Sequence, residues 1–361
     1  MAGLPDRRRH HEQSHLAPAG ARTPNSRAVT SRDVAKVAGV SQATVSRVLN
    51  GNATVTPATR ERVLRAVEST GYKPNLIARA MKTHRSGAVG IVVSDITNPF
   101  YPELIEALTA ELHQRGLRLV LWNSGDDGAD LAAIDAIHQS LVDGLVFTSA
   151  TDGLASLDAA AHERAPVVLV NRSPTTVEFD RVLTDNYAGG RLVARYLLAH
   201  GRRPAVLAGP ERASTARDRL RGFFDECRDL GCASAQIPTI HTEYAYAAGR
   251  DALIEILPIL RAGGYGLFCM NDVMALGATD AARHHGLSLP DDLWVVGFDD
   301  IDAASWTSYS LTTVRQPIRA MARAAIDLLA RRQAHPDRAP KQITFAPKLV
   351  VRASTADAPL P

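Results

Sequence analysis

The sequence predicts an all-α helix-turn-helix head followed by an α/β core of two lobes, each built on a doubly wound parallel sheet. Residues 30–71 hold three helix-length stretches separated by glycine-containing turns. From residue 88 onward, short apolar runs such as AVGIVVS alternate with helical stretches such as PELIEALTAELHQRG. This alternation is typical of parallel sheets covered by helices on both faces. The roughly 270 residues involved are too many for one such sheet, so we expect two lobes.

Composition indicates an ordinary globular protein whose charge is unevenly distributed. The 361 residues are 45% hydrophobic and 22% charged, with a net charge of +3. Residues 29–85 carry ten Lys or Arg and three Asp or Glu, a net +7, and residues 1–28 add +3, so the remainder carries −7. A basic head on an acidic body favours a polyanion as the partner of the head. A role of this charge in solubility alone stays open as the alternative.

Targeting and redox signals narrow the class of protein further. No apolar run reaches the roughly 18 residues that a membrane span needs, and the basic N-terminus lacks the apolar segment of a signal peptide. The three cysteines, Cys227, Cys232 and Cys269, have no metal-like spacing. We therefore expect a cytoplasmic protein without a metal site. Residues 1–27 are polar and aperiodic, and we expect a disordered extension there.

Local capping signals delimit the three helices of the head. Each expected start has a side chain that can accept a backbone N–H, or a proline in the first turn. These signals are Thr30 with Asp33, Ser41, and Thr56 with Pro57. Gly39 and Gly71 end the first and third helices, and the second is expected over residues 42–49. The third helix, to about residue 69, is expected to turn Val63, Leu64 and Val67 inward.

The two short helices around Gly39 have the form of a helix-turn-helix, whose second helix enters the major groove of DNA. Gln42, Ala43 and Arg47 are expected to project from this helix, where Gln can pair with adenine and Arg with guanine. Thr44 and Ser46 suit phosphate contacts, which position the protein without reading the bases. The alternative is a three-helix bundle whose polar side chains are only solvated.

The chain resembles the lactose-repressor/galactose-repressor family. The similarity is dense over TSRDVAKVAGVSQATVSRVLNGNATVTPATRERVLRAVESTGYKPNLIARAMKT and continues through VGIVVSDITNPFY, LTDNYAGG, RLRGF, NDVMALGA, VVGFDD and LTTVRQP. We accordingly divide the chain into a DNA-binding domain over 28–73, a hinge and linker over 74–85, and an effector-binding and dimerisation core over 86–361. Within the core we expect one lobe from 86–185 with 316–340 and another from 186–315 with 341–355.

The resemblance implies contacts with double-stranded, pseudo-palindromic operator DNA. The implied DNA-binding residues are Thr30, Ser41, Gln42, Ala43, Thr44, Ser46, Arg47, Asn50, Asn75, Arg79 and Met81. In the family, the segment matching residues 74–82 folds as a hinge helix on DNA and wedges an apolar side chain into the minor groove. Met81 holds that position, where Leu is usual; its thioether can still act as the wedge, and the strength of the kink stays open. Two hinges need two subunits, and the proline-broken end STADAPLP lacks a leucine heptad for tetramers, so we expect a homodimer.

The core resembles a periplasmic sugar-binding fold, which implies an effector cleft between the lobes. The implied cleft residues are Phe100, Tyr101, Arg172, Thr215, Arg219, Tyr244, Asn271 and Asp299. Asp299 and Arg219 can each make paired, charge-assisted hydrogen bonds to adjacent hydroxyls. As alternatives, these two residues form inter-lobe ion pairs and Phe100 belongs to the core.

Two positions depart from the purine-responsive members of the family. A second Arg of those proteins aligns with Ala213, and an aromatic lid residue aligns with Arg172. Both departures favour a sugar over a purine, and an anionic sugar stays open because Arg172 and Arg219 are available. Three further residues stay open between ligand contact and turn formation: Asp95, Asn98 and Asp185.

The resemblance implies a sequence-specific DNA-binding transcriptional regulator, most simply a repressor whose operator affinity is changed by a small-molecule effector. We expect the effector to be a sugar and expect no cofactor, no membrane partner and no catalytic residue. The protein would act in the cytoplasm on the nucleoid. A regulator or activator controlled by a protein corepressor or a non-sugar ligand stays open, and a stand-alone sugar-binding protein is a more distant alternative. An enzyme is disfavoured because the chain lacks G-x-G-x-x-G, G-x-x-x-x-G-K-[ST] and G-x-S-x-G.

Overall fold

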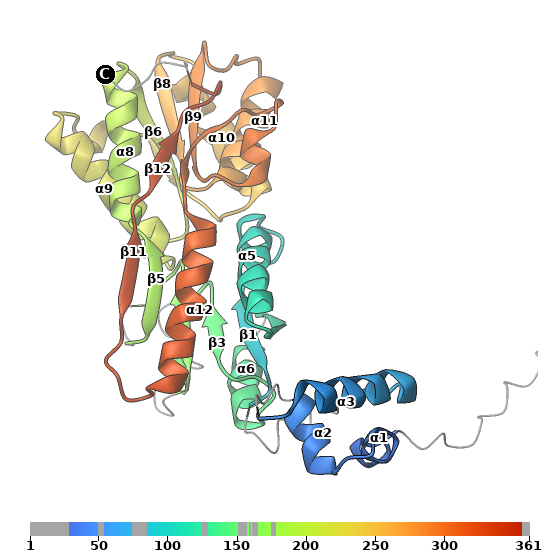
Figure 1. Cartoon of the computed structure of the whole chain (residues 1–361). Coiled ribbons are helices and arrows are strands. Elements are labelled where there is room, and N and C mark those ends of the chain that lie inside the picture. The colour runs from blue at the N-terminus through green and yellow to red at the C-terminus, as the bar shows by residue number, and fades with distance from the viewer. Residues whose placement is uncertain are drawn as a thin grey trace, which may run out of the picture. The chain divides into compact units, whose positions relative to one another are not determined.

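The computed structural model describes residues 29–49, 54–73, 85–124, 129–150, 157–158, 160, 165–174 and 178–355. The chain divides into two compact units, Met1–Asn75 and Leu76–Pro361, and each is described by itself (Figure 1). The expected extension over residues 1–27 and the expected hinge up to residue 84 lie outside the described residues.

Three helices form the head: α1 Ser31–Ala38, α2 Gln42–Leu49 and α3 Pro57–Thr70. The expected caps are present. The backbone N–H and the hydroxyl of Thr30 both donate to Asp33 Oδ2, at 2.9 and 2.7 Å, and Ser41 Oγ accepts the N–H of Thr44 at 3.1 Å. Gly39 ends α1 at a φ of 63°, a left-handed conformation that costs glycine little. Neighbours in sequence therefore fix where these helices begin and end.

A small apolar core joins the three head helices, and it corrects one expectation. Leu64, expected to face inward, is 50% exposed, whereas Val63 and Ala66 are buried and Val67 packs against the core. Positions 63, 66 and 67 share a helical face because they are three and four residues apart. Position 64 is about a quarter turn away from Val63, which turns its side chain out of the core.

The first lobe of the second unit is built on a six-stranded sheet in the order β11-β5-β4-β3-β1-β2, and every pairing is parallel. The strands are β1 Ala88–Val93, β2 Arg118–Asn123, β3 Leu145–Phe147, β4 Val167–Val170, β5 Asp180–Thr184 and β11 Gln342–Phe345. Alternate residues of β1 belong to different apolar clusters. One cluster includes α5 Phe100–Gln114 and α12 Ile318–Ala334, and the other includes α6 Ala129–His138. The sheet is thus covered on both faces.

The second lobe repeats this architecture in the order β12-β10-β9-β8-β6-β7. Its strands are β6 Arg203–Ala208, β7 Thr239–His241, β8 Tyr265–Cys269, β9 Leu293–Asp299, β10 Thr312–Arg315 and β12 Lys348–Val350. All pairings are parallel except that of β12 with β10. One face packs against α8 Asn186–Ala199 and α9 Ser214–Asp229, the other against α10 Tyr246–Leu260 and α11 Asp272–His284 (Figure 1). The short 3-10 helices η1 Ser234–Gln236 and η2 Asp302–Ser305 complete the lobe.

The chain crosses between the lobes three times: after β5, after β10, and between β11 and β12 (Figure 1). The last crossing corrects a boundary. Residues 341–355 were expected in the second lobe, but Gln342–Phe345 pair in parallel with Arg181–Thr184 in the first sheet. Pro347 separates β11 from β12, and a proline has no N–H to offer to a continuous strand. The two short strands therefore extend different sheets.

Each sheet has a topological switch point, where neighbouring strands run to helices on opposite faces. In the first sheet it lies between β1 and β3, and in the second between β6 and β8. Open α/β sheets bind ligands outside the carboxyl ends of the strands at such points. The residues that follow these strands are therefore where a ligand site is expected.

Candidate functional site

All eight residues expected in the effector cleft line one small cavity between the two lobes of the core. Phe100, Tyr101 and Arg172 come from the first lobe; Thr215, Arg219, Tyr244, Asn271 and Asp299 come from the second. Asn98 and Asn171 complete the lining. The cavity holds about 10 Å³, room for about one water molecule. Each residue follows the carboxyl end of a strand or lies in the first two turns of the next helix, as the sheet topology requires.

Arg219 is held by four groups of its own lobe. Its Nε donates to Asn186 Oδ1 at 2.8 Å, its Nη1 donates to the Met270 carbonyl, and its Nη2 donates to Asp299 Oδ1 at 3.3 Å. The guanidinium also lies 3.6 Å from the centroid of the Phe298 ring. The alternative that Arg219 and Asp299 form inter-lobe ion pairs is therefore wrong, because the two residues pair with each other inside the second lobe.

Asp299 ends β9 in a strained position and carries a perturbed carboxyl group. Its φ of 121° lies in a region that residues other than glycine rarely adopt. Such strained backbone conformations are most frequent at functional sites. Gln316 donates to its Oδ1 at 2.8 Å. Burial raises the pKa of Asp299, and the nearby Arg219 guanidinium opposes this shift. Burial, and then the Asp299 carboxylate, also raises the pKa of Asp272 to about 8. The two carboxyls titrate as a pair.

Three polar atoms on the cavity wall are buried and lack a hydrogen-bond partner in the described part of the chain. They are Asn171 Oδ1, Arg172 Nε and Asn271 Nδ2. Asn271 Oδ1 accepts the N–H of Met274 at 2.9 Å, so capping α11 fixes the amide and leaves its donor side open. A buried polar group without a partner costs about 1–3 kcal/mol. A ligand that supplied one donor and two acceptors here would remove that cost.

Aromatic side chains form the remaining walls. Tyr101 and Phe100 are almost fully buried. Phe100 lines the cavity and also belongs to the apolar core, which was the alternative for this residue. The Arg172 guanidinium lies 5.8 Å from the centroid of the Tyr244 ring, which brings the two lobes together at this point. A Cβ at position 209 would lie 2.4 Å from that ring, so Gly209 leaves the room that Tyr244 occupies. Burial raises the pKa of Tyr101, which keeps its hydroxyl protonated at neutral pH.

For three residues the sequence allowed either a ligand contact or a role in a turn, and the structure places them differently relative to the cleft. Asp95 Oδ1 accepts the N–H and the hydroxyl of Thr97 at 2.8 and 2.6 Å, which makes a turn. Asn98 Oδ1 accepts the N–H of Phe100 at 3.2 Å and also lines the inner cavity. Asp185 caps α8 by accepting the N–H of Ala188 at 2.8 Å and lines neither cleft cavity. Asp185 is therefore structural.

An outer cavity of about 390 Å³ continues the inner one between the lobes. Asn98, Tyr101, Arg172 and Tyr244 line both cavities. The other residues of the outer cavity are Val92, Ser94, Asp95, Ser124, Phe147, Ser149, Ala150, Pro210, Arg212, Glu243 and Ala245. This volume is within the range of small-molecule sites.

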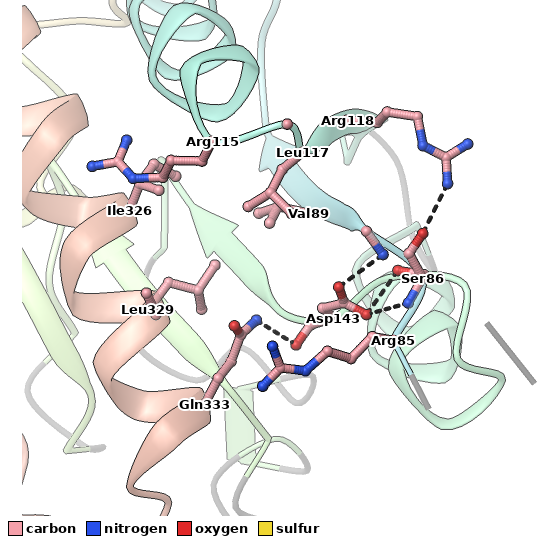
Figure 2. A pocket seen from close by; sticks show the side chains of 13 residues that line it. Arg85, Ser86, Val89, Arg115, Leu117, Arg118, Asp143, Ile326, Leu329 and Gln333 are labelled. Carbon is pink, nitrogen blue, oxygen red and sulfur yellow. Dashed lines mark hydrogen bonds between the residues drawn. The ribbon is translucent and has the colours of Figure 1, made fainter. Parts of the chain in front are cut away.

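A third cavity, of about 650 Å³, lies at the amino ends of β1, β2 and β3, away from the switch point (Figure 2). Its arginines are already engaged. Arg115 pairs with Glu111 and Asp327 at 2.8 and 2.7 Å, and Arg118 donates to the Ser86 carbonyl at 2.9 Å. Although it is larger, its position at the wrong end of a parallel sheet separates it from the effector cleft.

On the head, α2 presents the residues expected to meet DNA. Gln42, Ala43 and Arg47 are exposed, and Thr44 and Ser46 are partly exposed. Ser41 and Thr30 are also exposed, at the starts of α2 and α1. The remaining expected contacts lie outside the described residues: Asn50, Asn75, Arg79 and Met81. In the described ranges, no cluster of three or more His, Cys, Asp or Glu could hold a metal ion, and no helix could span a membrane.

Similarity to known proteins shows the family of this chain. Residues 30–75 match bacterial regulatory proteins of the lacI family, and residues 194–355 match a periplasmic binding protein-like domain. The ribose operon repressor of Escherichia coli (strain K12) is 31% identical over 329 residues, which cover 90% of this chain and 99% of that protein. This chain belongs to the lacI family.

Solved structures of lacI-family proteins agree with the fold. The Lac repressor dimer bound to operator and the anti-inducer ONPF is 26% identical, with a TM-score of 0.80 over 91% of this chain and 99% of that one. The regulator CelR in complex with cellobiose is 30% identical, with a TM-score of 0.69 over 90% of this chain and 99% of that one. The predicted head and two-lobed core are confirmed. The chain is a DNA-binding transcriptional repressor of the lacI family and not an enzyme, and it acts on bacterial DNA in the cytoplasm.

Proposed function

We propose that this lacI-family chain is a homodimeric repressor whose affinity for a pseudo-palindromic operator on the nucleoid is changed by a sugar bound between its lobes. One observation carries the proposal. The eight residues implied by the family resemblance line one cavity, where three buried polar atoms have no hydrogen-bond partner among the described residues, and the same chain carries a helix-turn-helix.

The chemistry of the cavity supports a sugar as the effector. Arg172 Nε and Asn271 Nδ2 are donors and Asn171 Oδ1 is an acceptor, and a sugar hydroxyl can serve both kinds of group. Asp299 already balances the charge of Arg219, so an anionic sugar would meet the charge of Arg172 rather than of both arginines, and this favours an uncharged sugar. The ribose operon repressor and the cellobiose complex of CelR point to the same class of ligand.

For ligand binding in the cleft to change DNA binding, some part of the protein must have two alternative arrangements. Here we take these to be two positions of the core lobes relative to each other. A ligand that contacts both lobes can change the relation between them only if it binds the two arrangements unequally. We infer that this change separates the hinges over residues 74–85 in the two subunits and withdraws the Met81 wedges from the minor groove.

A homodimer is supported by the edge of the first sheet. Val120 and Leu121 of β2 are each 37% exposed, and among the described strands β2 pairs with β1 alone. Natural proteins seldom leave an apolar edge strand open to water. A second copy of the chain would cover it, and two copies would place two helix-turn-helix units on the two half-sites of an operator.

The experiment that tests the proposal joins ligand binding to operator binding. The full chain is screened by thermal shift against pentoses, hexoses, disaccharides and nucleosides, since a ligand that binds only the folded state raises the melting temperature. The dissociation constant of the operator complex is then measured with and without a saturating amount of the hit. We expect a change of about 5-fold to 150-fold, the usual range of such coupling. An unchanged constant would contradict the proposal and favour a protein corepressor.

DNA reading by α2 has a test of its own. Arg47→Ala is expected to lose roughly 1–3 kcal/mol of discrimination at one base pair and to relax the choice of base there. Arg65→Ala is the matched control, because Arg65 is an arginine on α3 whose side chain is 69% exposed. Competition binding over operators with single substitutions measures both. An equal loss on every sequence would instead make Arg47 a phosphate contact.

A further inference from the structure

The effector cleft has two compartments of very different size. The inner cavity holds about 10 Å³ and the outer one about 390 Å³. The rings of Tyr101 and Tyr244 and the side chain of Arg172 line both. The inner cavity alone is too small for a sugar ring, so a ligand that reaches its polar atoms must also occupy part of the outer cavity.

The first-lobe side of the outer cavity carries hydroxyls and a carboxylate. Ser94, Ser124 and Ser149 line it, and Ser124 donates to the Val93 carbonyl at 3.0 Å. Asp95 uses Oδ1 for its turn, and within the described residues its Oδ2 makes no hydrogen bond. These groups can bind further hydroxyls beyond the inner cavity.

The second-lobe side carries a two-pronged ion pair. Arg212 Nη1 lies 2.8 Å from Glu243 Oε1, and Arg212 Nη2 lies 2.5 Å from Glu243 Oε2. The side chains are 64% and 56% exposed, and pairs so exposed contribute little to stability. The ion pair nevertheless holds the planar guanidinium of Arg212 and the planar carboxylate of Glu243 side by side at the cleft. Such a set of donors and acceptors can bind adjacent hydroxyls of a sugar.

We propose that the effector is an oligosaccharide of at least two linked sugar units. The terminal unit bonds to Arg172, Asn271 and Asn171, and the next unit lies in the outer cavity between Ser149 and the Arg212–Glu243 pair. The second unit is uncharged, because the charges of the outer cavity balance: Glu243 pairs with Arg212, and Asp95 offsets Arg172, so the cavity offers no net positive charge to a phosphate. This inference rests on the proposed function, in which the cleft binds a sugar.

Calorimetry on the full chain tests the proposal. The probes are glucose, galactose and xylose, the disaccharides maltose, cellobiose, lactose and xylobiose, and glucose 6-phosphate. We expect one disaccharide to bind at least tenfold tighter than its monosaccharide. Glu243→Ala is expected to remove most of that gain, so that the disaccharide affinity falls close to that of the monosaccharide. Ser149→Ala, on the other lobe, is also expected to lower the affinity for the disaccharide.

The control variant is Glu211→Ala. Glu211 has an 84% exposed side chain, lies near Arg212 in sequence and lines neither compartment of the cleft, so its removal should change no affinity. Equal affinities for mono- and disaccharide, with no effect of Glu243→Ala, would overturn this inference and leave a sugar effector standing. Tighter binding of the sugar phosphate would overturn it as well. No binding of any probe would overturn the inference and the proposed function together.

Discussion

Arg219 shows how a charged side chain can belong to a ligand cleft without offering its charge to the ligand. The residue is 2% exposed, and its guanidinium donates hydrogen bonds to Asn186, Met270 and Asp299. Removing one partner of such a buried pair leaves the other charge unpaired in a low dielectric. We therefore assign Arg219 first to holding the walls of the cavity and to neutralising Asp299.

A stability measurement separates this structural role from a purely ligand-binding one. Arg219→Ala is expected to lower the free energy of unfolding by about 3–5 kcal/mol, because the Asp299 carboxylate would stay buried without its cation. Urea unfolding of the full chain without ligand measures the loss. Arg221→Ala, on the same helix with a 64% exposed side chain, is the control and should change stability little. A loss below about 1 kcal/mol for Arg219→Ala would reject the structural role.

The neighbouring carboxyls predict a pH dependence of stability. Asp272 is fully buried and accepts the N–H of Ile301 at 2.9 Å, and burial followed by the Asp299 carboxylate raises its pKa to about 8. The unfolded chain loses this proton near pH 4, so between about pH 4 and pH 8 the folded state binds more protons. Stability from this group is therefore present at low pH and lost as pH rises towards 8. Asp272→Asn should flatten the fall in melting temperature between pH 5 and pH 8, and an unchanged slope would contradict the assignment.

At the scale of elements, glycines decide how closely two helix pairs approach. A Cβ at Gly222 of α9 would lie 2.0 Å from the Tyr187 carbonyl of α8, and a Cβ at Gly190 of α8 would lie 2.1 Å from the Arg219 carbonyl of α9. The α10–α11 pair repeats the arrangement with Gly277. The backbones of α8 and α9 thus touch beside Arg219, and this contact sets the depth of its side chain in the cleft.

Gly222→Ala tests that contact. The added methyl meets backbone and not a flexible side chain, so the helices must separate, and we expect a loss of about 1–3 kcal/mol or more. The shift of α9 should also weaken binding of the effector through Arg219. Arg228→Ala, on the last turn of α9 with a 66% exposed side chain, is the control for a substitution on the same helix. Thermal unfolding with and without ligand measures both effects, and wild-type behaviour would show that the helices have room.

Elements were predictable from sequence where their signals are local. The caps at Thr30 and Ser41 and the glycine at position 39 placed the first two head helices, because each acts on its own neighbours. The edge strand β11 was placed in the wrong lobe because its pairing with β5 joins residues far apart in sequence. Likewise, the resemblance supplied the residues of the cleft, but the Arg219–Asp299 pair depends on how α9 and β9 meet in space.

At the scale of the whole molecule, the exposed apolar residues of the core suggest where a second copy binds. Leu121 of β2 and Trp306, just after η2, are 37% and 54% exposed. They come from different lobes, so a partner that covers both would sense a change in the relation between the lobes. In the homodimer that we propose, an interface over both lobes would link the effector cleft of each subunit to the spacing of two DNA-binding heads.

Leu121→Glu tests the dimer and its role together. In the dimer, a carboxylate on β2 would be buried in the interface without a partner, which costs much free energy. In the monomer the same carboxylate stays in water, so the substitution destabilises the dimer far more than the monomer. We expect sedimentation velocity to show a monomer where the wild type shows a dimer. Operator affinity should fall by at least 100-fold, because each head then binds its half-site without the other. Leu230→Glu is the matched control, since Leu230 is 52% exposed just after α9 and far from β2 in sequence. A Leu121→Glu protein that stays dimeric would move the interface elsewhere, and a monomer with full operator affinity would remove dimerisation from the mechanism.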